Sequence, residues 1–93
     1  MYTRKTTIIN KTGIHARPAS DFVKLAETFS SDITIKNLSN GSDGNAKSII
    51  NVLLMELIKG CEIELSAKGD DEQLAVDKLI ELVDSGFGDL WVL

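Results

Sequence analysis

One short segment contains the only histidine and the only proline of the chain, with an arginine between them. It reads TGIHARPAS and includes His15, Arg17 and Pro18. A neutral imidazole is a competent nucleophile, and a guanidinium group is a planar cation that suits phosphate oxygens. Together these groups could accept and release a phosphoryl group. Because neither a second histidine nor a cysteine accompanies His15, the segment does not favour a metal site.

The spacing of apolar residues predicts an amphipathic helix over Ala16–Phe29, with Pro18 in its first turn, where its missing N–H group costs nothing. His15 then stands at the N-cap. An anion held there would meet the unpaired N–H groups of Ala16 and Arg17 at the positive end of the helix dipole. A histidine in this position can also be an ordinary helix cap, and the residue types alone leave both interpretations open.

The other elements follow from periodicity and turn residues. Alternating segments predict strands over 2–9, 32–38 and 61–68, with a very short strand after the NGSDG turn at 40–44. Helical spacing predicts helices over 48–59, ending at Gly60, and over 70–85, ending before Gly86. This order predicts an α+β fold with helices on one face of an antiparallel sheet.

Composition limits the class of protein. The 93 residues are 43% hydrophobic and 26% charged, which fits one small globular domain. We see neither an apolar run of membrane-spanning length nor a signal peptide, so we expect no membrane insertion and a cytoplasmic location. The single cysteine, Cys61, excludes an internal disulfide.

Charge is distributed unevenly along the chain, whose net charge is −4. Residues 1–24 carry five basic groups against one acid, whereas residues 60–93 carry nine acids against two basic groups. An acidic chain is a poor general binder of nucleic acid, so we expect no direct nucleic-acid partner. The basic N-terminal part could attract an anion or an acidic partner.

Three motifs resemble those of one family. GIHARPAS at 13–20 resembles the active-site motif of the HPr family, the histidine-containing phosphocarriers of the bacterial phosphoenolpyruvate-dependent sugar phosphotransferase system. NAKSII at 45–50 resembles the second motif of the family. The third stretch is matched by Gly60, the strand 62–67, Gly69 and Asp71-Glu72, so that the resemblance runs from about residue 3 to Gly86.

The resemblance implies an open-faced β-sandwich, in which a four-stranded antiparallel sheet carries three helices on one face. It implies a single HPr-like domain over 1–93, with residues 87–93 as a C-terminal extension. It further implies that His15 accepts a phosphoryl group on Nδ1 from phosphorylated Enzyme I and passes it to a histidine of Enzyme IIA of sugar-specific permeases. Arg17 would stabilise the transferred charge. The protein would then be a stoichiometric carrier without a cofactor, rather than an enzyme with its own small-molecule substrate.

The helix predicted over 48–59 is apolar nearly all round, and a domain of this size cannot bury every side of it. Some of its residues should therefore form an exposed patch of the kind that binds partners. The resemblance implies that Ile49, Ile50 and Leu53 form this patch beside His15, with Lys24 on its rim. The core of the domain would then take Val52, Leu54 or Met55, and Leu57 or Ile58.

Ser48 stands at the predicted N-cap of that helix, where its hydroxyl can satisfy a free N–H group. The resemblance adds a regulatory phosphorylation, since many HPr proteins carry a phosphoserine at the matching position. The implied partners are an HPr kinase/phosphorylase and a catabolite-control transcription factor. A phosphate at a helix N-terminus would cost the fold little and would hinder acidic partners.

Several positions depart from the family pattern. Asn51 and Glu56 stand where glycines are common, Gly44 stands where an apolar residue is usual, and the loop before Ser48 is longer. These departures keep open a specialised or mainly regulatory HPr paralogue with dedicated partners. A rival of a different class is a small α+β ligand-binding module whose histidine is only a cap. The tail Phe87–Leu93 is expected either to pack on the domain or to promote self-association.

Overall fold

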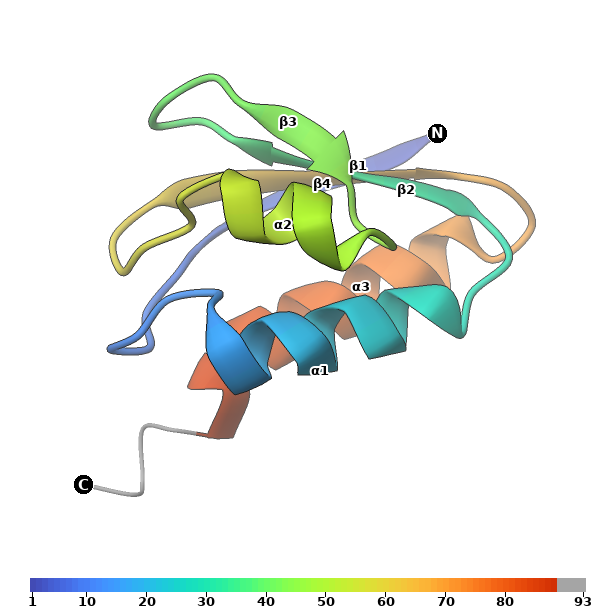
Figure 1. The fold of residues 1–93 in the computed structure, drawn as a ribbon. Helices are drawn as coiled ribbons and strands as arrows, with labels where there is room; N and C mark the ends of the chain where they lie inside the picture. Colours follow the sequence, from blue (N-terminus) through green and yellow to red (C-terminus); the bar gives the residue numbers. More distant parts are fainter. Residues whose placement is uncertain (89–93) are drawn as a thin grey trace.

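The computed structural model describes residues 1–88, which form a four-stranded antiparallel sheet with three helices below one face (Figure 1). The elements in chain order are β1 (Tyr2–Thr7), α1 (Ala16–Glu27), β2 (Asp32–Asn37), β3 (Asp43–Asn45), α2 (Ile49–Leu54), β4 (Glu62–Lys68), α3 (Glu72–Asp84) and the 3₁₀ turn η1 (Gly86–Gly88). The predicted fold class and the order of elements are confirmed.

The strands lie in the order β1-β4-β2-β3, and every neighbouring pair is antiparallel. Side chains alternate across each strand, so β2 and β4 bury one set of residues against the helices and present threonine, lysine and glutamate to solvent. Figure 1 shows all three helices on the same side, with the other face of the sheet bare.

One hydrophobic core lies between the sheet and the helices. Phe22 of α1 is fully buried, and α3 turns its own apolar face toward the sheet. In addition to Phe22, the largest fully buried apolar residues of the core include Ile8, Ile14, Ile35, Ile63, Leu65, Leu79 and Ile80. Burial on this scale is the main favourable contribution to folding, and it packs α1, which begins directly after His15, tightly against the sheet.

The second helix is shorter than predicted, because α2 ends at Leu54 instead of Lys59. Glu56 adopts a left-handed φ of 54°, which no continuing helix allows. The amides of Asn37 and Asn40 donate to the carbonyl of Met55, at distances of 3.0 Å and 3.2 Å, and so bind the C-terminal end of the helix. The predicted C-terminal cap at Gly60 is therefore wrong, and that glycine lies in the turn before β4.

The short third strand is present, but it begins at Asp43, inside the segment predicted as a turn, and its Gly44 makes room for the neighbouring helix. A Cβ atom at Gly44 would lie 3.0 Å from the Cβ of Asn51. The Asn51 side chain uses this space, since its Oδ1 accepts a hydrogen bond of 3.0 Å from the backbone N–H of Asn45. The small residue in the strand and the larger one in the helix therefore fit each other.

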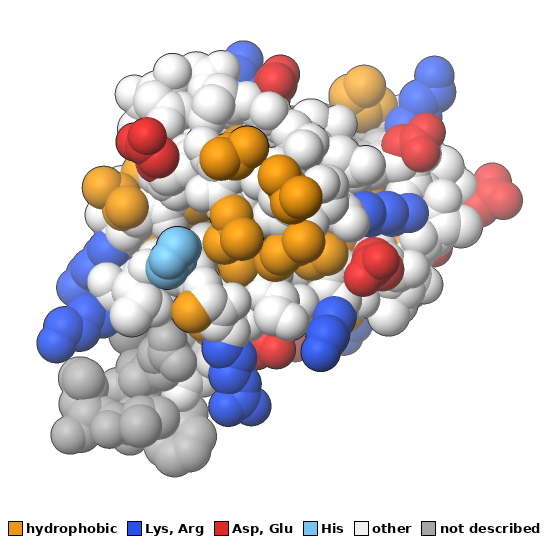
Figure 2. Space-filling model, in the orientation of Figure 1, with side chains coloured by type: hydrophobic (Ala, Val, Ile, Leu, Met, Phe, Trp, Pro, Cys, Tyr) orange, Lys and Arg blue, Asp and Glu red, His pale blue; other side chains and the backbone are white. Residues whose placement is uncertain are grey.

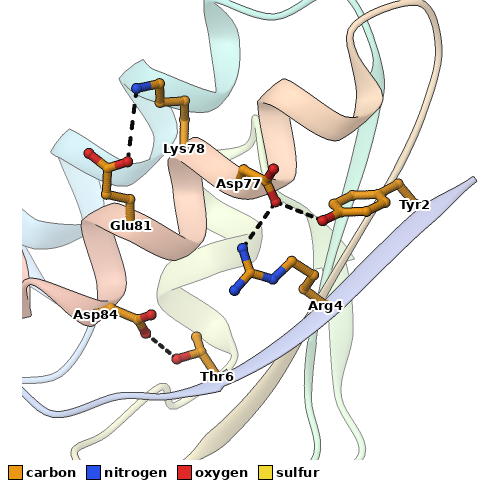
Figure 3. Close-up of polar contacts among 7 residues, drawn as sticks. All are labelled: Tyr2, Arg4, Thr6, Asp77, Lys78, Glu81 and Asp84. Atoms are coloured by element: carbon orange, nitrogen blue, oxygen red, sulfur yellow. Dashed lines mark hydrogen bonds and ion pairs between the residues drawn. The ribbon is translucent and has the colours of Figure 1, made fainter.

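The edge strand β1 is tied to α3 by polar side chains (Figure 3). Asp77 accepts hydrogen bonds from the Tyr2 hydroxyl (2.8 Å) and from Nη1 of Arg4 (3.0 Å), and Thr6 donates to Asp84. The bonds from Tyr2 and Arg4 lower the pKa of the Asp77 carboxyl, and the bond to Asp77 raises the pKa of the Tyr2 hydroxyl. Because these groups are partly exposed, each contact contributes little stability alone.

Phe87 packs against the core from η1, immediately after α3. The expectation for the remaining tail, packing or self-association, falls on residues 89–93, which lie outside the described part of the chain. None of the helices found in residues 1–88 combines the length and the hydropathy needed to cross a bilayer.

Candidate functional site

His15 occupies the N-cap of α1, as predicted, with an extended backbone (φ −142°, ψ 160°). Its side chain is exposed and makes no capping hydrogen bond. The first N–H groups of the helix therefore receive no acceptor from His15, and they can bind an anion instead. The interpretation of His15 as an ordinary side-chain cap finds no support in this geometry.

The two residues after His15 form the start of the helix. Ala16 adopts a φ of 51°, in the left-handed region that non-glycine residues rarely enter. Strain of this kind persists where the surrounding structure imposes it, and it clusters at functional sites. The Arg17 side chain is 91% exposed, with Nε 3.9 Å from Oδ2 of Asp21. Such an exposed pair is weak, so the guanidinium group is free to turn toward an incoming phosphoryl group.

The segment before His15 is held against the residues that follow α2. Gly13 adopts a φ of 70°, and a Cβ atom there would lie 2.3 Å from the carbonyl oxygen of Leu57. The N–H group of Ile14 donates to that same oxygen at 2.8 Å. From the other side, Nδ2 of Asn10 donates to the carbonyl of Gly13 at 2.8 Å. The backbone that carries His15 is thus fixed on both sides.

An exposed apolar surface lies next to the histidine. Figure 2 shows the single pale-blue side chain at the margin of a cluster of orange side chains, with blue basic groups around it. Five apolar residues of this surface are between 39% and 75% exposed. We call them the apolar patch, and they are Ile49, Ile50, Leu53, Leu54 and Ile58. Three members were predicted from the sequence. Of the core alternatives left open there, Met55 and Leu57 are buried, and Leu54 and Ile58 are not.

Lys24 lies beside this patch. It lines, with Ile49, a hollow of about 280 Å³ between α1 and the start of α2, which is lined in addition by Ser20, Val23, Glu27 and Lys47. The ammonium group of Lys47 donates to the carbonyl of Phe29 at 2.7 Å, and so ties the segment before α2 to the end of α1.

Ser48 is the N-cap of α2, as predicted. Its Oγ accepts a hydrogen bond of 3.3 Å from the N–H group of Asn51. The side chain is partly buried. This contact accounts for the serine structurally, because a serine cap typically contributes about 1 kcal/mol.

Two buried asparagines that support the site, Asn10 and Asn37, were not predicted from the sequence. A signal for Asn37 was present, since it follows Ile33 and Ile35 at the buried positions of an alternating strand. A polar residue at such a position must find hydrogen-bond partners. No comparable pattern marks Asn10, which lies in a turn.

The chain matches, over residues 2–85, the family model described as "PTS HPr component phosphorylation site". The chain belongs to the HPr family. The HPr of Haemophilus influenzae is 42% identical over 83 residues, covering 89% of this chain and 95% of that protein. The phosphocarrier protein NPr of Proteus mirabilis is 39% identical over 84 residues, covering 90% of this chain and 92% of its own.

The fold agrees with that of HPr. The crystal structure of HPr-C-His from Thermoanaerobacter tengcongensis superposes with a TM-score of 0.89 at 42% identity, covering 95% of this chain and 97% of that one. The predicted sheet of four antiparallel strands with three helices is therefore the HPr fold. This chain is a phosphocarrier of the phosphotransferase system by family.

Proposed function

We propose that this HPr-family protein accepts a phosphoryl group on His15 from phosphorylated Enzyme I and donates it to Enzyme IIA of sugar-specific permeases. One observation carries the proposal. An exposed histidine without a capping hydrogen bond stands at the N-terminus of a packed helix, two residues before an exposed arginine. We further propose that the transfer takes place in the cytoplasm and that residues 1–93 act as one domain, with 87–93 as an extension.

The step is a displacement at phosphorus. The electron pair on Nδ1 of neutral His15 forms the new N–P bond, while the bond between phosphorus and Enzyme I breaks and its electron pair stays with Enzyme I. The N–H groups of Ala16 and Arg17 and the Arg17 guanidinium face the charged phosphoryl oxygens. In such transfers, positioning and charge stabilisation supply most of the rate. Donation to a histidine of Enzyme IIA repeats the step, with His15 as the leaving group.

Intact mass after incubation with Enzyme I, Mg²⁺ and phosphoenolpyruvate tests the proposal. We expect a gain of one acid-labile phosphate on the native protein and none on His15→Ala. Arg17→Ala should keep the site but slow the transfer about tenfold or more, less than the roughly hundredfold effect of a preorganised donor, because the Arg17 side chain is exposed. A His15→Ala protein phosphorylated at the native rate would contradict the assignment.

Docking of both partners is proposed on the apolar patch and on Lys24. His15 lies at the margin of the patch, so a partner that covers the patch brings its own phosphoryl-donating or phosphoryl-accepting group to Nδ1. The positive charge of Lys24, on the rim, complements an acidic partner surface. Exposed apolar residues gathered on one face are typical of a binding surface.

Regulatory phosphorylation is proposed at Ser48, with an HPr kinase/phosphorylase as the modifying enzyme and a catabolite-control transcription factor as the reader. The serine lies at a helix start, beside Ile49 and Ile50 of the apolar patch, so a phosphate there would place about −2 charge next to the docking surface. Incubation with the kinase and ATP should add one phosphate to the native protein and none to Ser48→Ala. A native protein that stays unmodified would contradict this proposal.

A specialised HPr paralogue is the second candidate, and the 39% identity to a phosphocarrier named NPr favours keeping it. Parallel assays with a general Enzyme I and with the Enzyme I of a dedicated system separate the two candidates. The first candidate requires fast transfer from the general enzyme. Transfer from the dedicated enzyme alone would favour the paralogue.

A further inference from the structure

A buried asparagine connects the sheet to the end of α2. Asn37 is the last residue of β2 and only 1% exposed. A buried amide is tolerated only when its donors and acceptor are paired, because the desolvation cost is otherwise uncompensated. The partners of this side chain therefore show what it holds.

Both halves of the Asn37 amide are used. Nδ2 donates to the carbonyl oxygen of Met55 at 3.0 Å, with that of Glu56 at 3.4 Å, and Oδ1 accepts from the N–H group of Ser39 at 2.9 Å. Nδ2 of Asn40 reaches the same Met55 oxygen at 3.2 Å. Asn37 at the end of β2 and Asn40 in the connection to β3 thus bind the end of α2. Asn37 contacts the carbonyl groups of Met55 and Glu56, and Asn40 contacts that of Met55.

Leu57, the residue after Glu56, connects these hydrogen bonds to the site. Leu57 is buried, and its carbonyl oxygen accepts the N–H group of Ile14 at 2.8 Å. Gly13 packs so closely against that oxygen that a methyl group would not fit between them. Ile14 is bonded directly to His15. The position of the histidine backbone therefore depends on where Leu57 is held.

We infer that Asn37 is a positioning residue for phosphoryl transfer at His15, acting through Leu57 and Ile14, with Asn40 in support. The inference rests on the proposed phosphocarrier function. Loss of the Asn37 donor would let the carbonyl of Leu57 move and would shift the imidazole relative to the N–H groups of α1. A misplacement of about 1 Å can cost a factor of about 10² in rate.

The test compares Asn37→Ala and Asn37→Asp with the native protein. Asn37→Asp keeps an acceptor for Ser39 but replaces the donor with a carboxylate that faces two carbonyl groups. Val76→Ala, in the buried face of α3, is the control for a general loss of stability. Two quantities are measured on folded protein: hydrogen exchange of the Ile14 amide, and single-turnover transfer from phosphorylated Enzyme I over a range of its concentrations.

We expect Asn37→Ala and Asn37→Asp to lower the maximal transfer rate about tenfold or more, with a smaller change in the half-saturating concentration. The Ile14 amide should exchange faster than in Val76→Ala.

A maximal rate equal to that of Val76→Ala overturns the inference, whatever the exchange shows. If neither Asn37 variant folds, the exposed Asn40→Asp, which removes the second donor to the Met55 carbonyl, should still lower the maximal rate below that of Val76→Ala, and an equal rate would overturn the inference. A native protein that accepts no phosphate overturns the proposed function, and the role of Asn37 in transfer with it. A phosphorylated native protein with unaffected variants overturns the inference alone.

Discussion

Two residues at the site, Ala16 and Glu56, have left-handed backbones although both carry a Cβ atom. This conformation costs a non-glycine residue roughly 1–2 kcal/mol. Ala16 begins the helix behind the histidine, and Glu56 turns the chain from α2 toward Leu57. Both strained residues lie next to segments that position His15, since Ala16 follows His15 directly and Glu56 precedes Leu57.

Glu56→Gly should therefore stabilise the protein. Glycine enters the left-handed region freely, and its greater freedom in the unfolded chain removes only part of the gain, so we expect about 1 kcal/mol in the free energy of unfolding. Urea unfolding of native protein, Glu56→Gly and Glu56→Ala measures it. The alanine variant loses the charge but keeps the strain, so an equal gain in both variants would show that the backbone is not the cause.

His15, Arg17 and Ser48 could be located from sequence because helix starts have local signatures, including a proline in the first turn and a serine before an apolar run. The role of Asn37 could not, because its partners are backbone carbonyls more than fifteen residues away. The left-handed Glu56 was visible only as a glutamate where the family commonly has glycine. Hydrogen bonds between distant segments leave no pattern in a short window of sequence.

At the scale of elements, α2 carries four of the five residues of the apolar patch on which we propose that partners dock. It has six residues, and of these only Val52 is buried. Its other apolar side chains are exposed. The chain turns at Glu56, and the next apolar residue, Leu57, is buried in the core. A helix this short derives little stability from its own hydrogen bonds. It therefore depends on the bonds that Asn37 and Asn40 donate to Met55 at its C-terminal end, and on the bond that the Asn51 side chain accepts from the N–H group of Asn45.

Leu53→Glu should weaken binding of Enzyme I about tenfold or more, since a charge in the centre of an apolar interface removes contacts and adds an unpaired group. The dissociation constant from calorimetry measures the effect. Leu74→Glu is the matched control, because Leu74 is an exposed leucine on another helix, α3. Equal weakening by both variants would mean that charge, and not the apolar patch, governs binding.

The strands and the order of elements could be predicted because alternation and turn residues are local patterns. The length of α2 could not, since the apolar run continues past its end, and the helix is stopped by the left-handed Glu56 and by the tertiary hydrogen bonds to Met55. The same cause explains the exposure of Leu54 and Ile58, whose hydrophobicity favours the core. Periodicity does not show where a helix stops when the residues beyond it remain apolar.

At the scale of the whole molecule, Asp71 joins the start of β2 to the start of α3. Its carboxylate accepts hydrogen bonds from the hydroxyl of Ser31 and from the N–H groups of Ser30 (2.9 Å) and Ser31 (3.0 Å). These bonds, that from the Ser31 hydroxyl first, lower the pKa of Asp71 from 3.8 to about 2. The folded protein therefore holds this proton less tightly than the unfolded chain does.

The contribution of Asp71 to stability should be complete above its ordinary pKa and should be lost as the pH falls from about 4 to about 2. Asp71→Asn should lower the stability at neutral pH and flatten the loss of stability in this acid range. Urea unfolding at pH values from 2 to 7 measures both effects. Asp70→Asn, at an exposed neighbouring carboxylate, is the control, and an equally flattened curve there would contradict the role of Asp71.

The strand order has a consequence for the protein during its synthesis. β1 and β2 both pair with β4 and not with each other, so the sheet cannot close until Glu62–Lys68 has left the ribosome. Before that point only the hairpin of β2 and β3 can pair. The pairings of β4 with β1 and β2 join segments that lie far apart in the sequence, and such long-range pairings form slowly. The Leu57 carbonyl that holds Ile14 lies just before β4. A nascent chain should therefore present no correctly placed histidine to its partners until translation of the domain is almost finished.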